Sequence, residues 1–257
     1  MVAADPLVYQ EHPPAAALRR RVACYWTLTA GPRCPAHRVL PDGCLDILID
    51  FTRPRAEVVG VMTTAIVAQG GRAVDVLGVR FHPGEAPAFL GLAGRETRDD
   101  TLLLADVWGP IGRAFEGRLA EVADHAARLR LVDELLLSHL HHARAPDHRV
   151  RRVVERVRAA RGTVDVDTLA VEVGLSQRQL ERAFDVHVGL GPKAFARVMR
   201  LQAVVAEMEK GPASWARLAA DAGYSDQAHL VREVRALSGV TPGALRRERG
   251  LALDERA

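Results

Sequence analysis

Hydrophobic and polar positions follow different patterns in the first 90 residues and in the rest of the chain. In the first 90 residues, short runs rich in aliphatic and aromatic side chains alternate with turns that contain Gly and Pro. The clearest runs are RVACYWTLT (21–29), CLDILIDF (44–51), AEVVGVMTTAIVA (56–68) and AVDVLGVRF (73–81). Runs of this length between turn residues predict β-strands. Several strands at this spacing predict a small barrel or sandwich.

From Glu85 onward the apolar residues recur at helical spacing. EAPAFLGLAG predicts a short helix that ends at glycine, and WGPIGRAFEGRLAEV and DHAARLRLVDELLLSHLHHAR predict amphipathic helices. The last segment has an apolar stripe that serves either as core against the strands or as a dimer seam, formed by Leu129, Val132, Leu136 and Leu140. Its polar end, with His139, His141 and His142, is expected to be solvated surface.

The C-terminal part is predicted to be helical throughout, because its apolar runs are preceded by capping residues and followed by glycines. Ser and Asp side chains at a helix start accept hydrogen bonds from free backbone N–H groups. The candidate caps are Asp165, Asp167, Ser176 and Ser225, and the glycines expected to end helices or form turns are Gly174, Gly189 and Gly223.

Two segments of this part repeat one pattern: LAVEVGLSQRQLERAFDVHVGLGPKAF (169–195) and LAADAGYSDQAHLVREVRALSGVTPGAL (218–245). Each has a short helix that begins with Leu-Ala, then Gly, an apolar residue and Ser, then a longer helix. This is the pattern of a helix-turn-helix, in which Leu175 fills the core beneath the turn and Leu180 and Phe184 anchor the second helix. One such copy is as often a plain helical hairpin, but two copies in register predict DNA binding.

The outward faces of the two longer helices carry side chains suited to a major groove. Arg binds guanine and Gln binds adenine with two hydrogen bonds, Glu accepts from cytosine or orients a nearby Arg, and Ser at a helix start contacts phosphate. The candidate DNA-binding residues are Ser176, Gln177, Arg178, Glu181 and Arg182 in the first unit, and Ser225, Gln227, Ala228, His229 and Arg232 in the second. The helix between the units, PKAFARVMRLQAVVAEMEKG, is long enough to hold them at a fixed separation, and units ~34 Å apart could enter successive major grooves.

The segment from about Arg149 to Arg249 resembles the DNA-binding domain of the AraC/XylS family of transcription regulators, above all in LAADAGYSDQAHLVRE followed by GVTP. The resemblance implies two helix-turn-helix subdomains joined by a long helix, with base contacts from the residues just named. Val234 stands where the family usually has a core Phe, and Leu245 where it often has an aromatic residue. Both are apolar and predict a slightly smaller core.

The N-terminal phrases YWTL, HRVLPDGCLDILIDF, GVRFHPG and VWGP resemble the uncharacterised sensor domain found before many readers of this family. Such regulators commonly carry a small cupin-like β-barrel followed by a pair of helices. The expected fold class is therefore α+β: a cupin-like barrel and helices, then an all-α C-terminal domain.

The stretch 143–149, ARAPDHR, contains a proline and no apolar anchor, and we place the domain boundary there. Residues 1–145 are then a ligand-sensing or dimerisation domain, and residues 146–257 are the DNA-binding domain. The net charge of +3 is unevenly distributed. Residues 147–250 carry 18 Lys and Arg against 13 Asp and Glu, a balance of +5, whereas residues 1–146 carry 16 against 17, a balance of −1. A mildly basic C-terminal part suits a polyanionic partner.

A small barrel of this kind can hold a small-molecule effector. The candidate effector-binding residues, polar or aromatic and close to predicted strands, are Trp26, Arg38, Asp42, Cys44, Asp46, Arg80 and His82. The competing interpretation is that PDG (41–43) is only a turn and that Asp46 or Arg80 belongs to a structural ion pair.

The cysteines allow an alternative, a metal- or redox-responsive regulator that uses Cys24, Cys34 and Cys44. No two of them form a C-x-x-C arrangement, and isolated cysteines in strands are mostly core residues. A further alternative, a DNA-alkyl repair enzyme fused to such a reader, would need clustered zinc-ligating cysteines, and hydrolase, metalloprotease and nucleotide-binding motifs do not appear.

The sequence thus predicts a non-enzymatic transcription regulator without cofactor or resident metal, whose partners are double-stranded promoter DNA and an unknown effector. A homodimer, and RNA polymerase if the protein activates, are further partners that the resemblance implies. No apolar run approaches the ~20 residues of a membrane span, and the first residues show no signal pattern. With only three cysteines, a cytoplasmic location is expected.

Overall fold

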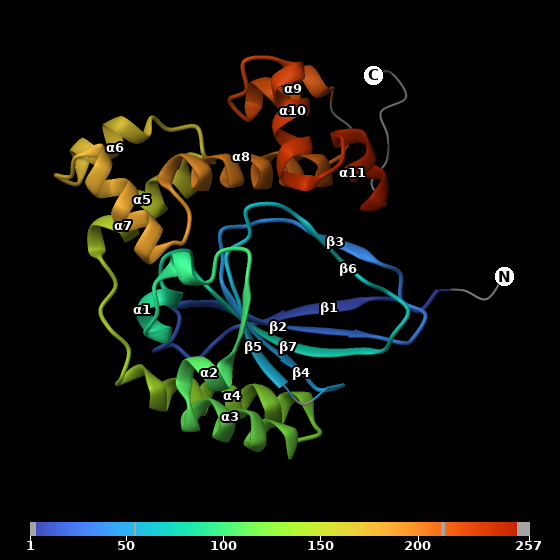
Figure 1. Ribbon diagram of the computed structural model, residues 1–257. Helices are drawn as coiled ribbons and strands as arrows, with labels where there is room; N and C mark the ends of the chain where they lie inside the picture. Colours follow the sequence, from blue (N-terminus) through green and yellow to red (C-terminus); the bar gives the residue numbers. More distant parts are fainter. Residues whose placement is uncertain (1–3, 54, 212–213, 251–257) are drawn as a thin grey trace.

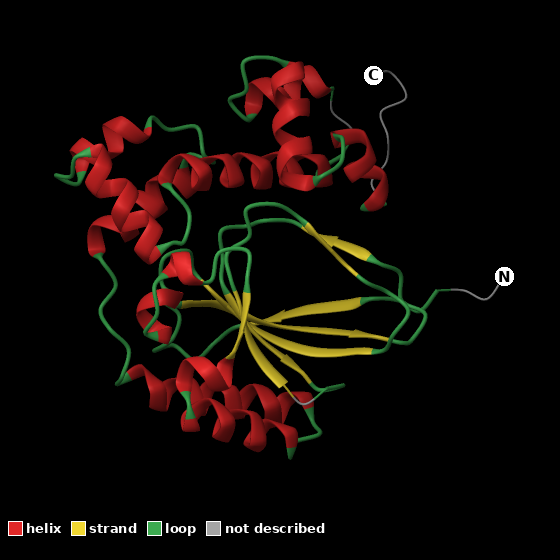
Figure 2. Ribbon diagram, in the orientation of Figure 1, coloured by secondary structure: helices red, strands yellow, loops and turns green. Residues whose placement is uncertain are grey.

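The computed structural model of the chain describes residues 4–53, 55–211 and 214–250 (Figure 1). All its strands lie in the N-terminal part, and the C-terminal part is built from helices alone (Figure 2). The strands are β1 (Val8–His12), β2 (Val22–Ala30), β3 (His37–Val39), β4 (Asp46–Asp50), β5 (Arg55–Val59), β6 (Ile66–Ala68), β7 (Val74–Phe81) and β8 (Thr101–Leu103). The predicted α+β class is confirmed.

The strands form an antiparallel sheet in the order β1-β2-β7-β4-β5-β8, and β3 pairs with β6 in a separate ribbon. Strand β7 lies inside the sheet between β2 and β4, and its Leu77, Val79 and Phe81 are fully buried. Among the described residues no ladder joins β1 to β8, so the strands predicted as a small cupin-like barrel take the form of a sheet and an accompanying ribbon.

The helices of the N-terminal part are α1 (Ala86–Leu90), α2 (Leu104–Trp108), α3 (Pro110–Ala120) and α4 (His125–Leu140). Figure 1 shows α3 and α4 side by side below the sheet. Their Phe115, Leu119, Val132 and Leu136 are buried in one core with Tyr25 and other sheet residues. The apolar stripe of α4 therefore serves as core. Leu129 and Leu140 at its margins are only partly buried.

His139 is not solvated surface, so that prediction is wrong for this residue. Its ring stacks on Trp108 with centroids 4.0 Å apart, and its Nε2 lies 3.2 Å from the carbonyl oxygen of Phe89. His141 and His142 are exposed, as expected. Spacing alone did not reveal that His139 lies on the side of α4 that faces α1 and α2.

The C-terminal helices are α5 (His148–Ala159), α6 (Val166–Glu172), α7 (Gln177–His187), α8 (Pro192–Glu209), α9 (Trp215–Asp221), α10 (Gln227–Ser238) and α11 (Pro242–Glu248). They enclose two separate cores, one under α6 and α7 and one under α9 and α10. Helix α8 contributes to both, because Val198 and Met199 belong to the first core and Leu201 and Val204 to the second. Its 18 residues span about 27 Å.

Caps and turns follow the predicted positions with two exceptions, Asp167 and Ser225. Asp167 lies in the first turn of α6, where its N–H donates to the Asp165 cap at 3.0 Å. Asp165 caps α6 and Ser176 caps α7, and Gly174, Gly189 and Gly223 have positive φ angles of 68°, 86° and 71°. Helix α10 is capped by Asp226, whose carboxylate accepts from the His229 N–H at 2.6 Å, and not by Ser225. Both residue types suit a cap, so the order Ser-Asp alone did not decide between them.

Loops of the sheet domain pack into both helical cores. Val61, in the loop after β5, is fully buried among residues of the first core, and Leu40, just after β3, belongs to the second. The Gln202 side chain on α8 donates to the carbonyl oxygen of Pro41 at 2.7 Å. In Figure 1 these loops lie between the strands and α8. The helical domain therefore packs against the sheet domain along the length of α8.

Candidate nucleic-acid interface

The first helix-turn-helix unit consists of α6, the turn at Gly174 and α7. Leu169 and Ala170 bury the inner side of α6, and Leu180 and Phe184 bury the inner side of α7. The Leu175 N–H donates to the Ala170 carbonyl at 3.0 Å across the turn, and its side chain packs against the same core. The inner face of α7 is thereby fixed, and its opposite face is free.

That free face carries Gln177, Arg178, Glu181 and Arg182, all exposed. Within the described part of the chain, these four side chains form neither hydrogen bonds nor ion pairs, so their polar groups are available to a partner. Ser176 is engaged in a capping box: its Oγ accepts from the Gln179 N–H at 3.3 Å, and the Ser176 N–H donates to Gln179 Oε1 at 2.8 Å.

A shallow groove of about 300 Å³ runs beside this face, lined by Arg149, Leu175, Gln179, Arg182, Ala183, Val186 and His187. It adds Arg149, at the start of α5, to the cationic edge next to Arg182. Sequence reasoning missed Arg149, although an arginine in the first turn of α5, two residues after the Asp147 cap, could have drawn attention to it. Arg149 pairs with Asp147 at 2.7 Å, so the groove edge is only partly cationic.

The second unit repeats this arrangement with α9, the turn at Gly223 and α10. Leu230 and Val234 are fully buried, and Leu245 on α11 closes the same core, so the smaller apolar residues at 234 and 245 do fill core positions. Gln227, Ala228 and Arg232 are exposed on the outer side of α10.

His229 is held by the turn rather than free. Its Nδ1 lies 3.1 Å from Ser225 Oγ, and its ring packs edge-on against Tyr224 with centroids 5.2 Å apart. Counted from the caps, Val231 and Arg235 occupy the positions that Glu181 and Asp185 occupy on α7. The sequence analysis did not name Val231 or Arg235 among the candidate DNA contacts.

On the sheet domain, five of the predicted effector residues come together. The register of β4 and β7 sets Asp46 opposite Arg80, and Arg80 Nη2 donates to Asp46 Oδ2 at 3.1 Å. Trp26 Nε1 donates to the same oxygen at 3.0 Å. Asp42 lies 3.6 Å from Arg80 Nε and accepts from the Cys44 N–H at 2.9 Å. The indole of Trp26 crosses Gly78, where a Cβ atom would lie 1.9 Å from the ring.

Burial raises the pKa of Asp46 to about 6, and the positive charge of Arg80 opposes this increase.

The other two predicted effector residues, Arg38 and His82, lie outside this cluster. Arg38 donates to Glu248 at 2.8 Å and to the Ser238 carbonyl at 3.0 Å, which links β3 to the second helix-turn-helix unit. His82 Nε2 lies 3.2 Å from the carbonyl oxygen of Arg19.

The three cysteines are free thiols. Burial raises the pKa of Cys24 to about 11 and that of Cys44 well above its usual value. The Cys34 thiol donates to the Arg72 carbonyl at 3.2 Å. In the described ranges, no group of three or more His, Cys, Asp or Glu side chains lies close enough to hold a metal ion.

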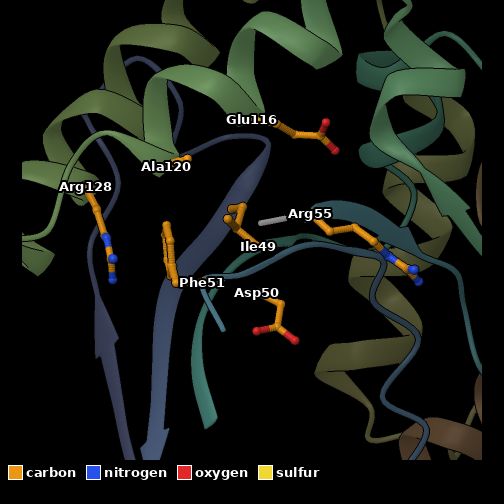
Figure 3. Close-up of a pocket in the computed structure, with 7 residues that line it drawn as sticks. All are labelled: Ile49, Asp50, Phe51, Arg55, Glu116, Ala120 and Arg128. Atoms are coloured by element: carbon orange, nitrogen blue, oxygen red, sulfur yellow. The ribbon is translucent and has the colours of Figure 1, made fainter. Parts of the chain in front are cut away.

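A small cavity lies between the end of β4, the start of β5 and the helices α3 and α4 (Figure 3), lined by Ile49, Asp50, Phe51, Arg55, Glu116, Ala120 and Arg128. The Arg128 guanidinium lies over the Phe51 ring, 3.4 Å from its centroid. With a volume of about 60 Å³, the cavity accommodates a few water molecules and not a drug-sized ligand. None of the predicted effector residues lines it.

Two helix-turn-helix units with free outer faces place the C-terminal domain in the helix-turn-helix class. Residues 169–248 match the family described as a helix-turn-helix domain, and the C-terminal domain belongs to the AraC type of that class. Residues 10–102 match a domain of unknown function, DUF6597. Among the residues that the structure describes, no helix has the length and apolar character needed to span a bilayer.

Curated relatives share only part of their length with this chain. The HTH-type transcriptional regulator MtrA of Neisseria gonorrhoeae is 28% identical over 103 residues, which cover 40% of this chain and 33% of MtrA. The probable bifunctional transcriptional activator/DNA repair enzyme AlkA of Mycobacterium tuberculosis (strain H37Rv) is 39% identical over 90 residues, or 34% of this chain and 18% of AlkA. The matched part thus spans a third or less of these relatives.

Two solved structures match this chain with TM-scores below 0.5. A probable AraC family transcriptional regulator from Rhodopseudomonas palustris has 29% identity and a TM-score of 0.36, and the match covers 40% of this chain and 98% of that one. ToxT from Vibrio cholerae O395 has 10% identity and a TM-score of 0.44, and the match covers 97% of this chain and 98% of that one.

Proposed function

We propose that the chain is a sequence-specific transcription regulator that binds double-stranded promoter DNA with α7 and α10. The observation that carries the proposal is the repeated unit, in which each second helix is fixed by its own core and leaves its outer face free. Helix α8 spans about 27 Å between the units, on the scale of one helical turn of DNA, ~34 Å.

The exposed side chains have the chemistry of base contacts. Arg178, Arg182 and Arg232 can each bind guanine O6 and N7, and Gln177 and Gln227 can bind adenine N6 and N7. Ser176 and Ser225 lie at the helix starts, where backbone N–H groups attract phosphates. The balance of +5 over 147–250 supports binding to a polyanion.

We further propose that a small-molecule effector acts through the sheet domain, 1–145, on the DNA-binding domain, 146–257. The polar cluster of Trp26, Asp46 and Arg80 is the candidate effector site, with Asp42 and Cys44 at its margin. The competing interpretation, a structural ion pair, is favoured by the fact that Asp46 is bonded to both Trp26 and Arg80. A chain of this kind acts in the cytoplasm, as a homodimer or a monomer, and contacts RNA polymerase if it activates transcription.

A metal- or redox-responsive regulator is the alternative function. The raised thiol pKa values of Cys24 and Cys44 argue against it, because a protonated thiol is a poor nucleophile and metal ligand. A repair enzyme fused to a helix-turn-helix reader has less support, since it would need clustered cysteines. Elemental analysis of the purified chain tests the metal alternative, because stoichiometric metal would favour it.

The main proposal is tested by selecting binding sites from random DNA with the full chain and measuring affinities for the selected site. Replacing Arg178→Ala or Arg232→Ala is expected to weaken binding by about 1–3 kcal/mol, because each arginine loses a base contact and no intramolecular bond. Arg118→Ala on α3 removes the same charge far from the proposed interface and should change affinity little. Wild-type affinity in both interface variants would contradict the assignment.

A further inference from the structure

The two recognition helices have the same setting but different outer faces. When α7 and α10 are aligned on their caps, Ser176 with Asp226, the buried anchors coincide, Leu180 with Leu230 and Phe184 with Val234. The outward positions of the two helices can therefore be compared one to one.

On α7 these positions are all polar: Gln177, Arg178, Glu181 and Arg182. On α10 the same positions hold Gln227, Ala228, Val231 and Arg232. The two middle positions of α10 thus offer only methyl groups. Ala228 is exposed, and Val231 is half-buried against the second core. Because they are three residues apart in a helix, their side chains are neighbours on one face.

No other polar side chain of the first turn of α10 fills that gap. His229 is turned toward the unit itself, with its Nδ1 at Ser225 Oγ and its ring against Tyr224. The outer face of α10 is therefore polar at Gln227 and Arg232 and apolar between them. In the major groove, the apolar feature that distinguishes one base from the others is the 5-methyl group of thymine.

We infer, on the basis of the proposed function, that the second unit reads an A·T-rich half-site in which a thymine methyl group packs between Ala228 and Val231. The first unit reads a guanine-containing half-site through Arg178 and Arg182. The target is thus a pair of unlike half-sites, not a palindrome or a direct repeat.

The test uses the full chain and its selected site, with every thymine of one half-site replaced by deoxyuridine. Deoxyuridine keeps the base-pairing groups and lacks only the methyl. Fluorescence anisotropy titrations should show binding weakened about fourfold for each methyl that packs against the second unit, from the transfer free energy of one buried carbon. The same replacement in the first half-site should leave the affinity unchanged.

Three variants test whether Ala228 and Val231 cause the deoxyuridine penalty. Ala228→Arg places on α10 the side chain that Arg178 places on α7, at an exposed position where folding tolerates it. It should abolish the deoxyuridine penalty and select guanine at the facing base pair. Val231→Ala should reduce the penalty, whereas Arg178→Ala should weaken binding overall and leave the penalty in the second half-site intact.

The outcomes distinguish the inferred thymine contact from the proposed function. Specific binding without a deoxyuridine penalty, or with equal penalties in both half-sites, would overturn the inference and leave the proposed function standing. Absence of sequence-specific binding by the full chain would overturn the proposed function itself.

Discussion

Val61 allows a direct test of how the two domains are joined. Its side chain is fully buried in the core of the first helix-turn-helix unit, although it follows β5 of the sheet domain. A Cβ atom on Gly189, two residues after the end of α7, would lie 2.6 Å from Val61 Cγ1, so the two segments are in close contact. Val58, three residues earlier, is equally buried but belongs to the core of the sheet domain.

The substitutions Val61→Ala and Val58→Ala therefore remove the same atoms from different cores. Each deletes two buried methyl groups, and at about 1–1.5 kcal/mol per group the expected cost is about 2–3 kcal/mol. Some amides exchange only when the affected core opens. For these amides, a cost of that size lowers the protection factor about 30- to 150-fold.

Hydrogen–deuterium exchange of the full chain distinguishes the two effects. In Val61→Ala the amides of α5 and α7 should exchange faster, and in Val58→Ala those of β4 and β7 should. Unchanged exchange in α7 of Val61→Ala would refute the placement of Val61 in the first unit. Identical acceleration of all segments in both variants would refute the reasoning that the cores open separately.

Two further predictions concern buried charges. Glu85 is nearly inaccessible and accepts a hydrogen bond from Arg151 on α5 at 2.7 Å, so Glu85→Ala should reduce the free energy of unfolding by about 3 kcal/mol. Glu134→Ala, which removes one partner of an exposed pair, should reduce it by less than about 1 kcal/mol. Chemical denaturation measures both losses, and similar losses would contradict the argument from burial. Burial raises the pKa of Asp46 to about 6, so its folded state holds a proton between about pH 4 and 6 that the unfolded state releases. Its contribution to stability is greatest below pH 4 and declines as pH rises to 6. The stability of wild type relative to Asp46→Asn should therefore fall by about 3 kcal/mol over this window, whereas a constant difference would rule out the titration.

The helical domain could be predicted largely from the sequence, because its determinants are local. Glycine at the turn, a capping residue after it and apolar anchors at helical spacing all lie within about 15 residues, and the repeat supplied an internal check. The cap of α10 was misassigned because Ser225 and Asp226 are both good caps. Only the contacts of their side chains decide between them.

The sheet domain could be predicted less completely, because strand pairing joins distant segments. The run 56–68 was expected as one strand, yet it forms β5 and β6 in different sheets, with the Gly60 N–H bonded to Asp100 between them. Strand β1, VYQEH, is an exposed edge with little apolar signal, and β3 and β8 are three residues long. The length and hydrophobicity of a sequence run do not predict strands that are so short or so exposed.

The candidate effector site could be predicted from the sequence only in part. Trp26, Asp46 and Arg80 were named for their residue types, and the strand register brings them together. Arg38 was named with them, but its bonds to Glu248 and Ser238 depend on how the two domains pack. Nothing in the local sequence of β3 predicts a partner 200 or 210 residues away.

The participation of Leu40 and Val61 in the helical cores limits how this chain can exchange parts with other proteins. A chimaera joined near residue 146, with a different sensor in front, would leave both helix-turn-helix units without an apolar side chain that they now enclose. Such a graft would succeed only if the incoming sensor presented aliphatic residues at the same two loops. Evolution by domain shuffling would face the same condition, so the two halves of this protein are expected to have been inherited together.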